Sequence, residues 1–404
     1  MTTTSTAPRT GAKIHPLAVV GLVLVAINLR PAVTSLGPVL AEVRAGLGMS
    51  AAVAGLLTSV PAVCFALVGS TAPLLARRWG TGGVIALGTT ALALGLAVRP
   101  FAGGTASFIA LTALALAGIA LANVLLPVVV KQRFPDRVGA MTGLYSVALN
   151  LGASTAAAVT VPLTSGAFHG DWRLGLGVWA VIAAAALPPW ILLARDRTPH
   201  PVPAGLIGAA APVAGLQLRR QPIAWALAVY FGLQSTAAYV IMGWLPQIFR
   251  DAGLSARTAG LLFAVTALLG VPLSFLLSAF AGRLVRQSGL AVLIGLFGLA
   301  GYAGLWAGPA AAPWLWVVLL GVANCSFPLV LTMIALRGRD AATVARLSAF
   351  AQSTGYLLSV PGPIVVGVLY DRTGSWQIPL ALMALLMVPQ MVAGALAGRD
   401  RQIG

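Results

Sequence analysis

The sequence predicts an all-α membrane protein whose twelve transmembrane helices form two pseudo-symmetric six-helix bundles. Of the 404 residues, 59% are hydrophobic and 8% are charged, and the mean hydropathy is +0.95, which excludes an ordinary soluble protein. Twelve apolar runs approach the ~20 residues that a spanning helix needs. Landmarks in the first six runs recur in the last six, which indicates a duplication.

Short charged or Pro/Gly-rich breaks separate the runs, which divide the chain into two bundles, a linker and two tails. The runs cover approximately 17–40, 53–75, 83–99, 107–130, 139–163, 173–194, 222–246, 259–281, 289–308, 313–336, 345–369 and 376–398. We expect an N-terminal tail at 1–16, a first bundle at 17–194, a linker at 195–221, a second bundle at 222–398 and a tail at 399–404.

Basic residues are distributed unevenly between the two sides of this layout. With the N-terminus inside, 18 of the 25 Lys and Arg residues fall in cytoplasmic segments, 6 fall in outer segments, and Arg30 lies within a run. The positive-inside rule then places both termini and the linker in the cytoplasm, as expected for a multi-pass protein of the bacterial plasma membrane. The net charge of +17 therefore reflects topology, and we expect no nucleic-acid partner.

The duplication is visible in matched residues. Ala-Gly-Leu-Leu stands at 54–57 and again at 259–262, an offset of 205, and the basic turns at 76–78 and 281–283 have the same offset. Asn123 with Pro127 matches Asn324 with Pro328 at an offset of 201. An even number of helices per half keeps both halves in the same orientation, which is the parallel repeat of the major facilitator fold.

Three longer segments resemble the CynX/NimT family of transporters. They are NLRPAVTSLGP from Asn28, AGLLTSVPAVCF from Ala54, and FAQSTGYLLSVPGPIVVGVLYDRTGSW from Phe350. Because the segments lie in both halves, the resemblance covers essentially the whole chain. It implies a major facilitator transporter for a small polar or anionic solute, such as cyanate or a nitroimidazole. The loops LARRWGTGG and AGRLVRQSG keep the basic part of the usual superfamily signature and lack its aspartate.

Arg30 is the residue around which we expect the function to be organised. It lies near the midpoint of the first apolar run, where a guanidinium costs roughly 2.5–3.5 kcal/mol on insertion scales and normally faces a bundle interior or a wet cavity. It could bind solute. The alternative is that Arg30 only ties neighbouring helices together through backbone carbonyls.

Other polar side chains near the middle of the runs are further candidates for solute binding. The resemblance implies that helices 1, 4, 7 and 10 line the cavity, and the candidates there and on helices 5 and 11 are Asn28, Asn123, Gln234, Ser235, Asn324, Tyr145, Asn150, Gln352 and Tyr356. Each amide could instead bridge helices, for about 0.6 kcal/mol on average. Asn123 and Asn324 could cap kinks at the prolines four residues on. Asn28 and Arg30 are about 200° apart around a regular helix, so Pro31 would have to distort the turn for both to face one cavity.

These features favour a secondary transporter working by alternating access. The alternative is a multidrug-type exporter of small neutral amphipathic compounds. An intramembrane enzyme or sensor would need His, Asp or Glu at mid-membrane depth, and the sequence places none there, so we expect no catalytic residues, metal or cofactor. We expect either uncoupled flux or proton coupling through an outer acid such as Glu42 or Asp371, or through the solute itself. We expect a monomer whose partners are the solute and the lipid bilayer.

Overall fold

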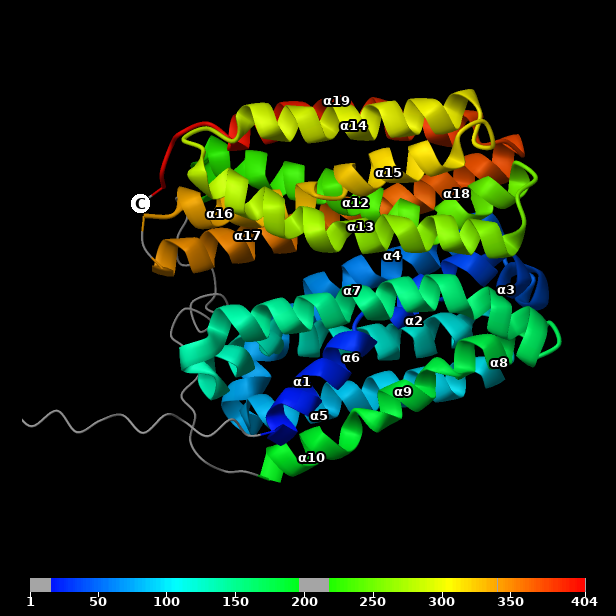
Figure 1. Cartoon of the computed structure of the whole chain (residues 1–404), viewed down its shortest axis with the longest axis horizontal. Helices are drawn as coiled ribbons and strands as arrows, with labels where there is room; N and C mark the ends of the chain where they lie inside the picture. Colours follow the sequence, from blue (N-terminus) through cyan, green and yellow to red (C-terminus); the bar gives the residue numbers. More distant parts are fainter. Residues whose placement is uncertain (1–15, 196–217, 340, 404) are drawn as a thin grey trace, which may run out of the picture.

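The computed structural model describes residues 16–195, 218–339 and 341–403. These residues form two helical halves that lie side by side (Figure 1). In the described part of the chain, the only β-type pairing is a single bridge between Gly338 and Ile403. The expected tail at 1–16 and linker at 195–221 lie largely outside the described residues.

The first half contains short and long helices that correspond to the first six predicted runs. They are α1 (Pro16–Asn28), α2 (Pro31–Thr34), η1 (Gly37–Val39), α3 (Leu40–Leu47), α4 (Ala51–Leu67), η2 (Gly69–Thr71), α5 (Ala72–Val98), η3 (Arg99–Phe101), α6 (Thr105–Arg133), η4 (Pro135–Arg137), α7 (Val138–Pro162), η5 (Leu163–Ala167), α8 (Trp172–Gly177), α9 (Trp179–Ala185) and α10 (Leu187–Arg195).

The second half corresponds to the last six runs and has longer uninterrupted helices. They are η6 (Leu218–Arg220), α12 (Pro222–Asp251), α13 (Ala256–Arg283), α14 (Ser288–Ala307), α15 (Pro313–Ala323), α16 (Ser326–Arg337), α17 (Ala341–Ser359), α18 (Pro361–Thr373) and α19 (Gln377–Ala397).

Eleven segments of the described chain are long and apolar enough to cross a membrane. One of them, Ala51–Phe101, has 51 residues and turns at Gly80, whose φ is 75°. At 1.5 Å per residue a helix of this length would measure about 76 Å, more than twice the ~30 Å hydrocarbon core, so it accounts for two passes. This division yields twelve passes.

The duplication extends to the helix caps. The Ser50 hydroxyl accepts a hydrogen bond from the Val53 N–H at 3.2 Å and begins α4, and the Ser255 hydroxyl accepts one from the Thr258 N–H at 3.1 Å and begins α13. The two serines are 205 positions apart, the offset found in the sequence. A side-chain acceptor at this position satisfies an N–H that the helix leaves unpaired.

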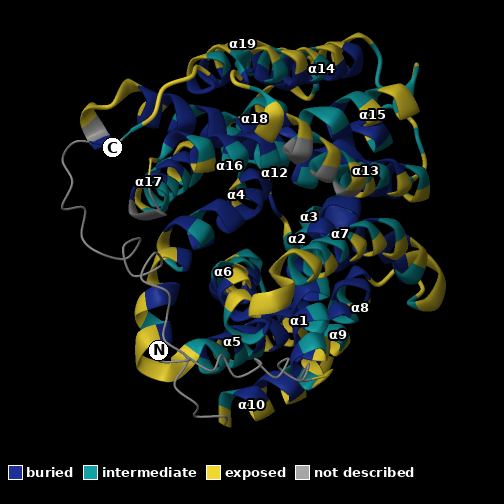
Figure 2. Cartoon of the chain, turned by 60° about the vertical axis from the view of Figure 1, so that its left-hand side comes forward, coloured by how far each residue is buried: buried dark blue, intermediate teal, exposed yellow. Residues whose placement is uncertain are grey.

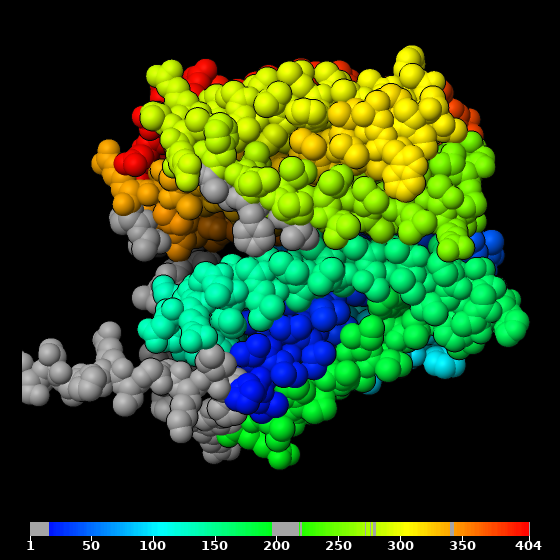
Figure 3. All heavy atoms as spheres, viewed as in Figure 1, coloured from blue at the N-terminus to red at the C-terminus, as the bar shows by residue number. Residues whose placement is uncertain are grey.

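The two halves pack through a few helices, and their packing differs from one end of the molecule to the other. α7 lies along α13, and α4 lies along α17 and α18. We call the end that carries α3 the α3 end (right in Figure 1) and the end that carries the C-terminus the C-terminal end (left). Figure 3 shows the surface hollowed between α17 and α7 at the C-terminal end.

Burial follows this arrangement. α12 is largely buried, whereas α14 and α19 expose apolar side chains on their outer faces, such as Leu293 and Val392 (Figure 2). Apolar exposure of this kind is expected where lipid replaces water as the solvent. One buried cluster contains residues of both halves, including Leu36, which directly precedes η1, and Trp244 of α12. This cluster packs the two halves against each other at the α3 end.

Glycines allow the main chains of the two halves to touch near the α3 end. A Cβ on Gly55 of α4 would collide with the Pro363 carbonyl of α18, and a Cβ on Gly367 of α18 would collide with the Ala51 carbonyl of α4. Only glycine permits this approach of backbone to backbone.

Candidate functional site

Arg30 lies where the first transmembrane pass is interrupted. It is the 15th residue of the 32-residue segment Pro16–Leu47, between the end of α1 and the start of α2. Its carbonyl accepts from the N–H groups of Val33 and Thr34, both at 3.0 Å, which fixes the backbone. The side chain is half-buried. The break follows from Pro31, because proline has no N–H to donate to the carbonyl four residues earlier and its ring crowds that carbonyl.

The Arg30 guanidinium has no hydrogen bond or ion pair within the described chain. The carboxylates that form ion pairs there do so elsewhere: Glu42 with Arg250 and Asp371 with Arg44. Asp251 accepts from Tyr370 and Trp376, both at 2.8 Å. A buried charge is costly unless it is paired. The described protein groups supply no counter-charge to the half-buried Arg30 guanidinium, so its donors are free to bind water or a solute.

Two tyrosines from the second half lie within electrostatic range of Arg30. The charge of Arg30 acts on the hydroxyls of Tyr239 of α12 and Tyr356 of α17. Tyr356 and Cys64 of α4 also interact electrostatically with the Tyr239 hydroxyl, so these four side chains lie near one another between the halves. Within the described chain neither tyrosine hydroxyl makes a hydrogen bond. The sequence predicted Tyr356 as a candidate and missed Tyr239.

The amide of Asn28 is engaged inside the first half. It donates to the carbonyls of Leu24 at 2.8 Å and Ile182 of α9 at 3.1 Å, and the residue is 1% exposed. This placement agrees with the ~200° that separates Asn28 from Arg30 around a helix. The two side chains do not share one surface.

Asn123 and Asn324 occupy matched sequence positions but different local structures. α6 continues unbroken through Pro127, and Asn123 is exposed on the face of α6 that also carries Leu116. The tenth pass breaks at Asn324, between α15 and α16. There the Asn324 carbonyl, freed from regular pairing by Pro328, accepts from the Phe327 N–H at 3.2 Å and the Gln234 side chain at 3.5 Å.

The remaining candidates are half-buried, and two of their amides bond within their own helices. Gln352 donates to the Ser348 hydroxyl at 2.6 Å, and Asn150 donates to the Ser146 carbonyl at 2.8 Å. Asn150 faces the second half, since its Oδ1 would lie 3.7 Å from a Cβ on Gly270 of α13. Tyr145 packs against the core of the first half.

Aromatic rings from both halves surround Tyr356. The Phe65 ring of α4 stacks on it with centroids 5.3 Å apart and an interplanar angle of 19°. The Phe231 ring of α12 meets it edge-on at 4.9 Å and 88°. Phe65 follows Cys64 directly, so this aromatic group adjoins the neighbourhood of Arg30. It forms an apolar wall beside the charged group.

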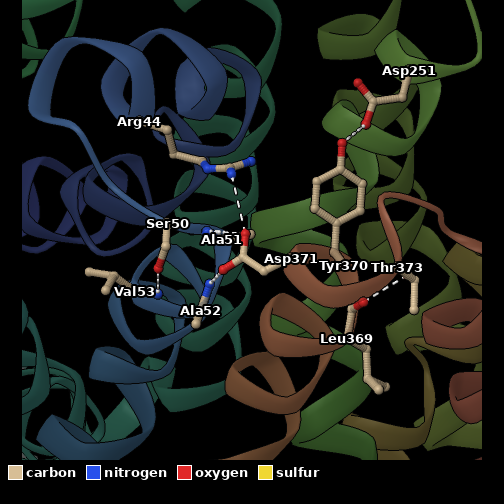
Figure 4. Close-up of polar contacts among 10 residues, drawn as sticks. All are labelled: Arg44, Ser50, Ala51, Ala52, Val53, Asp251, Leu369, Tyr370, Asp371 and Thr373. Atoms are coloured by element: carbon tan, nitrogen blue, oxygen red, sulfur yellow. Dashed lines mark hydrogen bonds and ion pairs between the residues drawn. The ribbon is translucent and has the colours of Figure 1, made fainter.

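Polar contacts close the interface at the α3 end (Figure 4). The Asp371 carboxylate of α18 accepts from the N–H groups of Ala51 at 2.8 Å and Ala52 at 2.7 Å, at the start of α4, and lies 3.7 Å from the Arg44 guanidinium. A carboxylate is favoured at a helix N-terminus because it meets unpaired N–H groups and the positive end of the helix dipole. Asp371 thus binds one half to the other.

A narrow cavity lies on the α3 side of Arg30, and it is not a polar site. It is lined from the first half by 32–33, 36–37, 57–58, 61, 112 and 116, and from the second by Gly243. Its two hydroxyl groups, of Thr58 and Thr112, donate to carbonyls of their own helices at 3.0 and 2.8 Å. The solute-binding candidates lie on the other side of Arg30.

Sequence reasoning also missed Arg99, which we placed in an outer segment. Its side chain is 0% exposed, donates to the Ala32 carbonyl at 3.2 Å, and lies 5.5 Å from the Phe108 ring centroid. Arg99 is thus more enclosed than the half-buried Arg30, although it stands at the end of an apolar run. Arg99 contacts the backbone two residues beyond Arg30 and supports the break in the first pass.

Residues 22–363 match the family model described as Major Facilitator Superfamily. A protein named "Uncharacterized transporter YycB" from Bacillus subtilis (strain 168) is 36% identical over 387 residues, covering 95% of this chain and 94% of that protein. The 2-nitroimidazole transporter of Escherichia coli (strain K12) is 33% identical over 386 residues, covering 95% and 96%. The cyanate transport protein CynX of the same organism is 30% identical over 382 residues, covering 92% and 94%.

Solved structures show the same fold at low sequence identity. A bacterial homologue of the human lysosomal transporter Spinster, in an inward-facing and occupied conformation, superposes with a TM-score of 0.74 at 15% identity, covering 95% of this chain and 96% of that one. The nucleoside transporter NupG superposes with a TM-score of 0.71 at 14% identity, covering 95% and 99%.

Proposed function

The chain belongs to the major facilitator superfamily, and from this premise we propose that it is a secondary transporter that moves a small polar or anionic solute, cyanate- or nitroimidazole-like, across the plasma membrane by alternating access around Arg30. The observation that carries the proposal is the Arg30 guanidinium at the middle of the first pass, between the two halves, which has no hydrogen-bonded or ion-paired partner among the described residues.

A guanidinium presents a planar fork of N–H donors that suits an anion or a strongly polar group. In the described chain these donors have no acceptor. A solute with acceptor atoms can therefore form hydrogen bonds with the Arg30 guanidinium. Tyr356, Asn123 and Gln352 are the other candidates that we assign to the solute pathway. We assign Asn28 to packing between the first and sixth passes, because both of its hydrogen bonds are made inside one half.

The two ends of the interface support alternating access. Ion pairs and backbone contacts join the halves at the α3 end, while the surface is hollowed at the C-terminal end. The basic residues are concentrated toward the C-terminal end, which the positive-inside rule places in the cytoplasm. The conformation is therefore the one that opens to the cytoplasm, and the opposite conformation requires the α3 end to part.

The aromatic rings around Tyr356 favour a second candidate function, the export of neutral amphipathic compounds. An exporter of neutral amphipathic compounds needs ring-bearing walls, and the rings of Phe65 and Phe231 provide them. Such a solute would not depend on the charge of Arg30. Dependence on Arg30 therefore separates the two functions.

A thermal-shift screen of the purified chain tests the proposal, followed by flux into liposomes with the compounds that bind. The panel contains small anions, nitroimidazoles and neutral amphipathic compounds. We expect anions or strongly polar compounds to stabilise the protein, and the shift to disappear in Arg30→Ala. Stabilisation by neutral compounds alone, unchanged in that variant, would favour the exporter.

A further inference from the structure

The wall and the donors around Arg30 narrow the kind of solute, if the proposed function is correct. Arg30 contributes a guanidinium fork from the first half, and Tyr239 and Tyr356 contribute hydroxyl groups from two helices of the second half. All three can donate, and in the described chain none of these donors has an acceptor. A solute group that complements these donors has several acceptor atoms in one plane.

A carboxylate meets this requirement better than a linear anion does. Its two oxygens match two parallel N–H groups of a guanidinium, and each oxygen keeps a further lone pair for a hydroxyl donor. A linear anion offers one terminal atom to the fork at a time. The donor set therefore favours a planar two-oxygen head.

The rest of the neighbourhood suits a flat ring. Tyr356 carries both a donor hydroxyl and a ring, and that ring is oriented by Phe65 on its face and by Phe231 at its edge. Phe231 is in turn packed against Phe327 of α16, with centroids 5.8 Å apart. Aromatic rings associate preferentially in offset-stacked or edge-to-face arrangements, and such pairs are worth more than their buried area alone.

We infer that the solute is a planar, ring-bearing carboxylate of about the size of benzoate, whose carboxylate is held by Arg30, Tyr239 and Tyr356 and whose ring lies against the aromatic wall led by Phe65. Tyr239 and Phe65 are thereby specificity-determining residues. The inference rests on the proposed function and adds the shape of the solute to it.

Binding of four matched compounds to the full chain in detergent, measured by isothermal titration calorimetry at neutral pH, tests the inference. Benzoate has the charge and the flat ring, cyclohexanecarboxylate has the charge and a puckered ring, benzamide has the ring without the charge, and cyanate has the charge without the ring. We expect benzoate to bind about tenfold more tightly than the other three.

Variants assign the effect to residues. Tyr239→Phe and Tyr356→Phe each remove one donor to a charged group and should weaken benzoate binding about tenfold. Phe65→Leu and Tyr356→Leu remove a ring and should abolish the preference for benzoate over cyclohexanecarboxylate. Tyr302→Phe and Phe101→Leu are the matched controls, a buried tyrosine of α14 and an exposed ring of η3, and should change neither quantity.

The possible failures are distinct. If benzoate does not bind, binds no more tightly than cyclohexanecarboxylate or cyanate, or keeps its preference in both ring variants, the inference is overturned. The proposed function survives that result as long as some anion binds in an Arg30-dependent manner. If benzamide binds as tightly as benzoate and Arg30→Ala changes neither, the inference and the proposed function both fail.

Discussion

Glu42 and Arg250 join the two bundles through a two-pronged ion pair. The Glu42 Oε1 lies 2.8 Å from Arg250 Nη2, and Oε2 lies 2.9 Å from Nη1. The Arg250 and Glu42 side chains are 23% and 33% exposed, so water screens the pair. Exposed pairs of this kind contribute about 0.2–1 kcal/mol. The pair therefore biases the closure of the α3 end without locking it.

Neutralising this pair should shift the population toward the conformation open at the α3 end. We expect Glu42→Gln or Arg250→Gln to raise the open fraction by up to about fivefold, the equivalent of ~1 kcal/mol. Spin labels on cysteines at Ala45 and Arg257, one on each half, report the distance distribution. The charge-swapped double variant E42R/R250E should restore the closed distance, and Asp171→Asn, which affects a cap inside one half, should leave it unchanged. Identical distributions in all variants would contradict the assignment.

Asp371 should contribute both to the stability of α4 and to closure of the α3 end. A control variant at the N-terminus of α4 separates the two effects. Asp371→Ala removes the acceptor of two N–H groups of α4, which should cost about 1 kcal/mol, as loss of a helix cap does, and should open the α3 end. Ser50→Ala removes the cap that α4 receives from its own half. It should lower the melting temperature similarly without changing the distance between the two labels. An equal change of that distance in both variants would show that the effect is merely loss of helix stability.

Proton coupling should depend on the acids of the α3 end or on the solute. The described carboxylates of that end, Glu42, Asp171, Asp251 and Asp371, all form hydrogen bonds. The Asp, Glu and His residues that pumps usually employ are missing near Arg30 in the described chain. With a solute that does not titrate, we expect E42Q/D371N to abolish any accumulation in liposomes that is driven by a pH gradient. Accumulation that persists in this double variant would contradict the prediction.

Arg30→Lys and Arg30→Ala should remove solute binding and leave the empty protein at least as stable as the parent. Lysine keeps the charge but loses the two-pronged donor geometry. Because the guanidinium has no hydrogen-bonded partner in the described chain, its removal leaves no protein acceptor unpaired. The deciding measurement is the solute-induced shift of the melting temperature, with Arg283→Lys as a control. A fall in stability without solute would instead indicate that Arg30 ties helices together.

The two ends of the molecule should be labelled from opposite sides of the membrane. Gly103 lies in the exposed connection between α5 and α6, and Gly139 lies near the start of α7, and both positions have open space for a side chain. In sealed cells, an impermeant thiol reagent should modify Gly103→Cys and spare Gly139→Cys. The native Cys64 and Cys325 are buried and should give little background. The reverse pattern would invert the topology.

The sequence predicted the passes well because they depend on local signals, and the assignment of Arg30 to the site remains a prediction. An arginine within an apolar run is conspicuous on composition alone, and the 205-residue offset anticipated the matched caps at Ser50 and Ser255. The apolar run at 53–75 extended past the true end of α4 at Leu67, since Gly69 and Pro73 interrupt the helix without reducing its hydropathy. Hydropathy indicates which segments are apolar enough to lie in the membrane, and it does not detect such breaks in a helix.

The parts that escaped prediction depend on which way a side chain faces. Tyr239 lies four residues after Ser235 on one helix face, and a period of 3.6 could have joined them, but a tyrosine within an apolar run attracts no notice. Arg99 stands at the end of a run, where basic residues are routine, and its burial arises only from packing against Phe108 and Ala32. The pairing of Glu42 with Arg250 could not be predicted from the sequence, because it depends on how the two halves pack against each other.

The contact of Gly55 with the Pro363 carbonyl, and of Gly367 with the Ala51 carbonyl, makes a single methyl group an effective spacer at the α3 end. Rigid main chain lies opposite each glycine, so an added Cβ cannot be absorbed by rotating a side chain. Gly55→Ala and Gly367→Ala should therefore hold the halves apart at that end while leaving each bundle intact. The two variants offer a way to trap the opposite conformation for structure determination, without a ligand and without a change of charge.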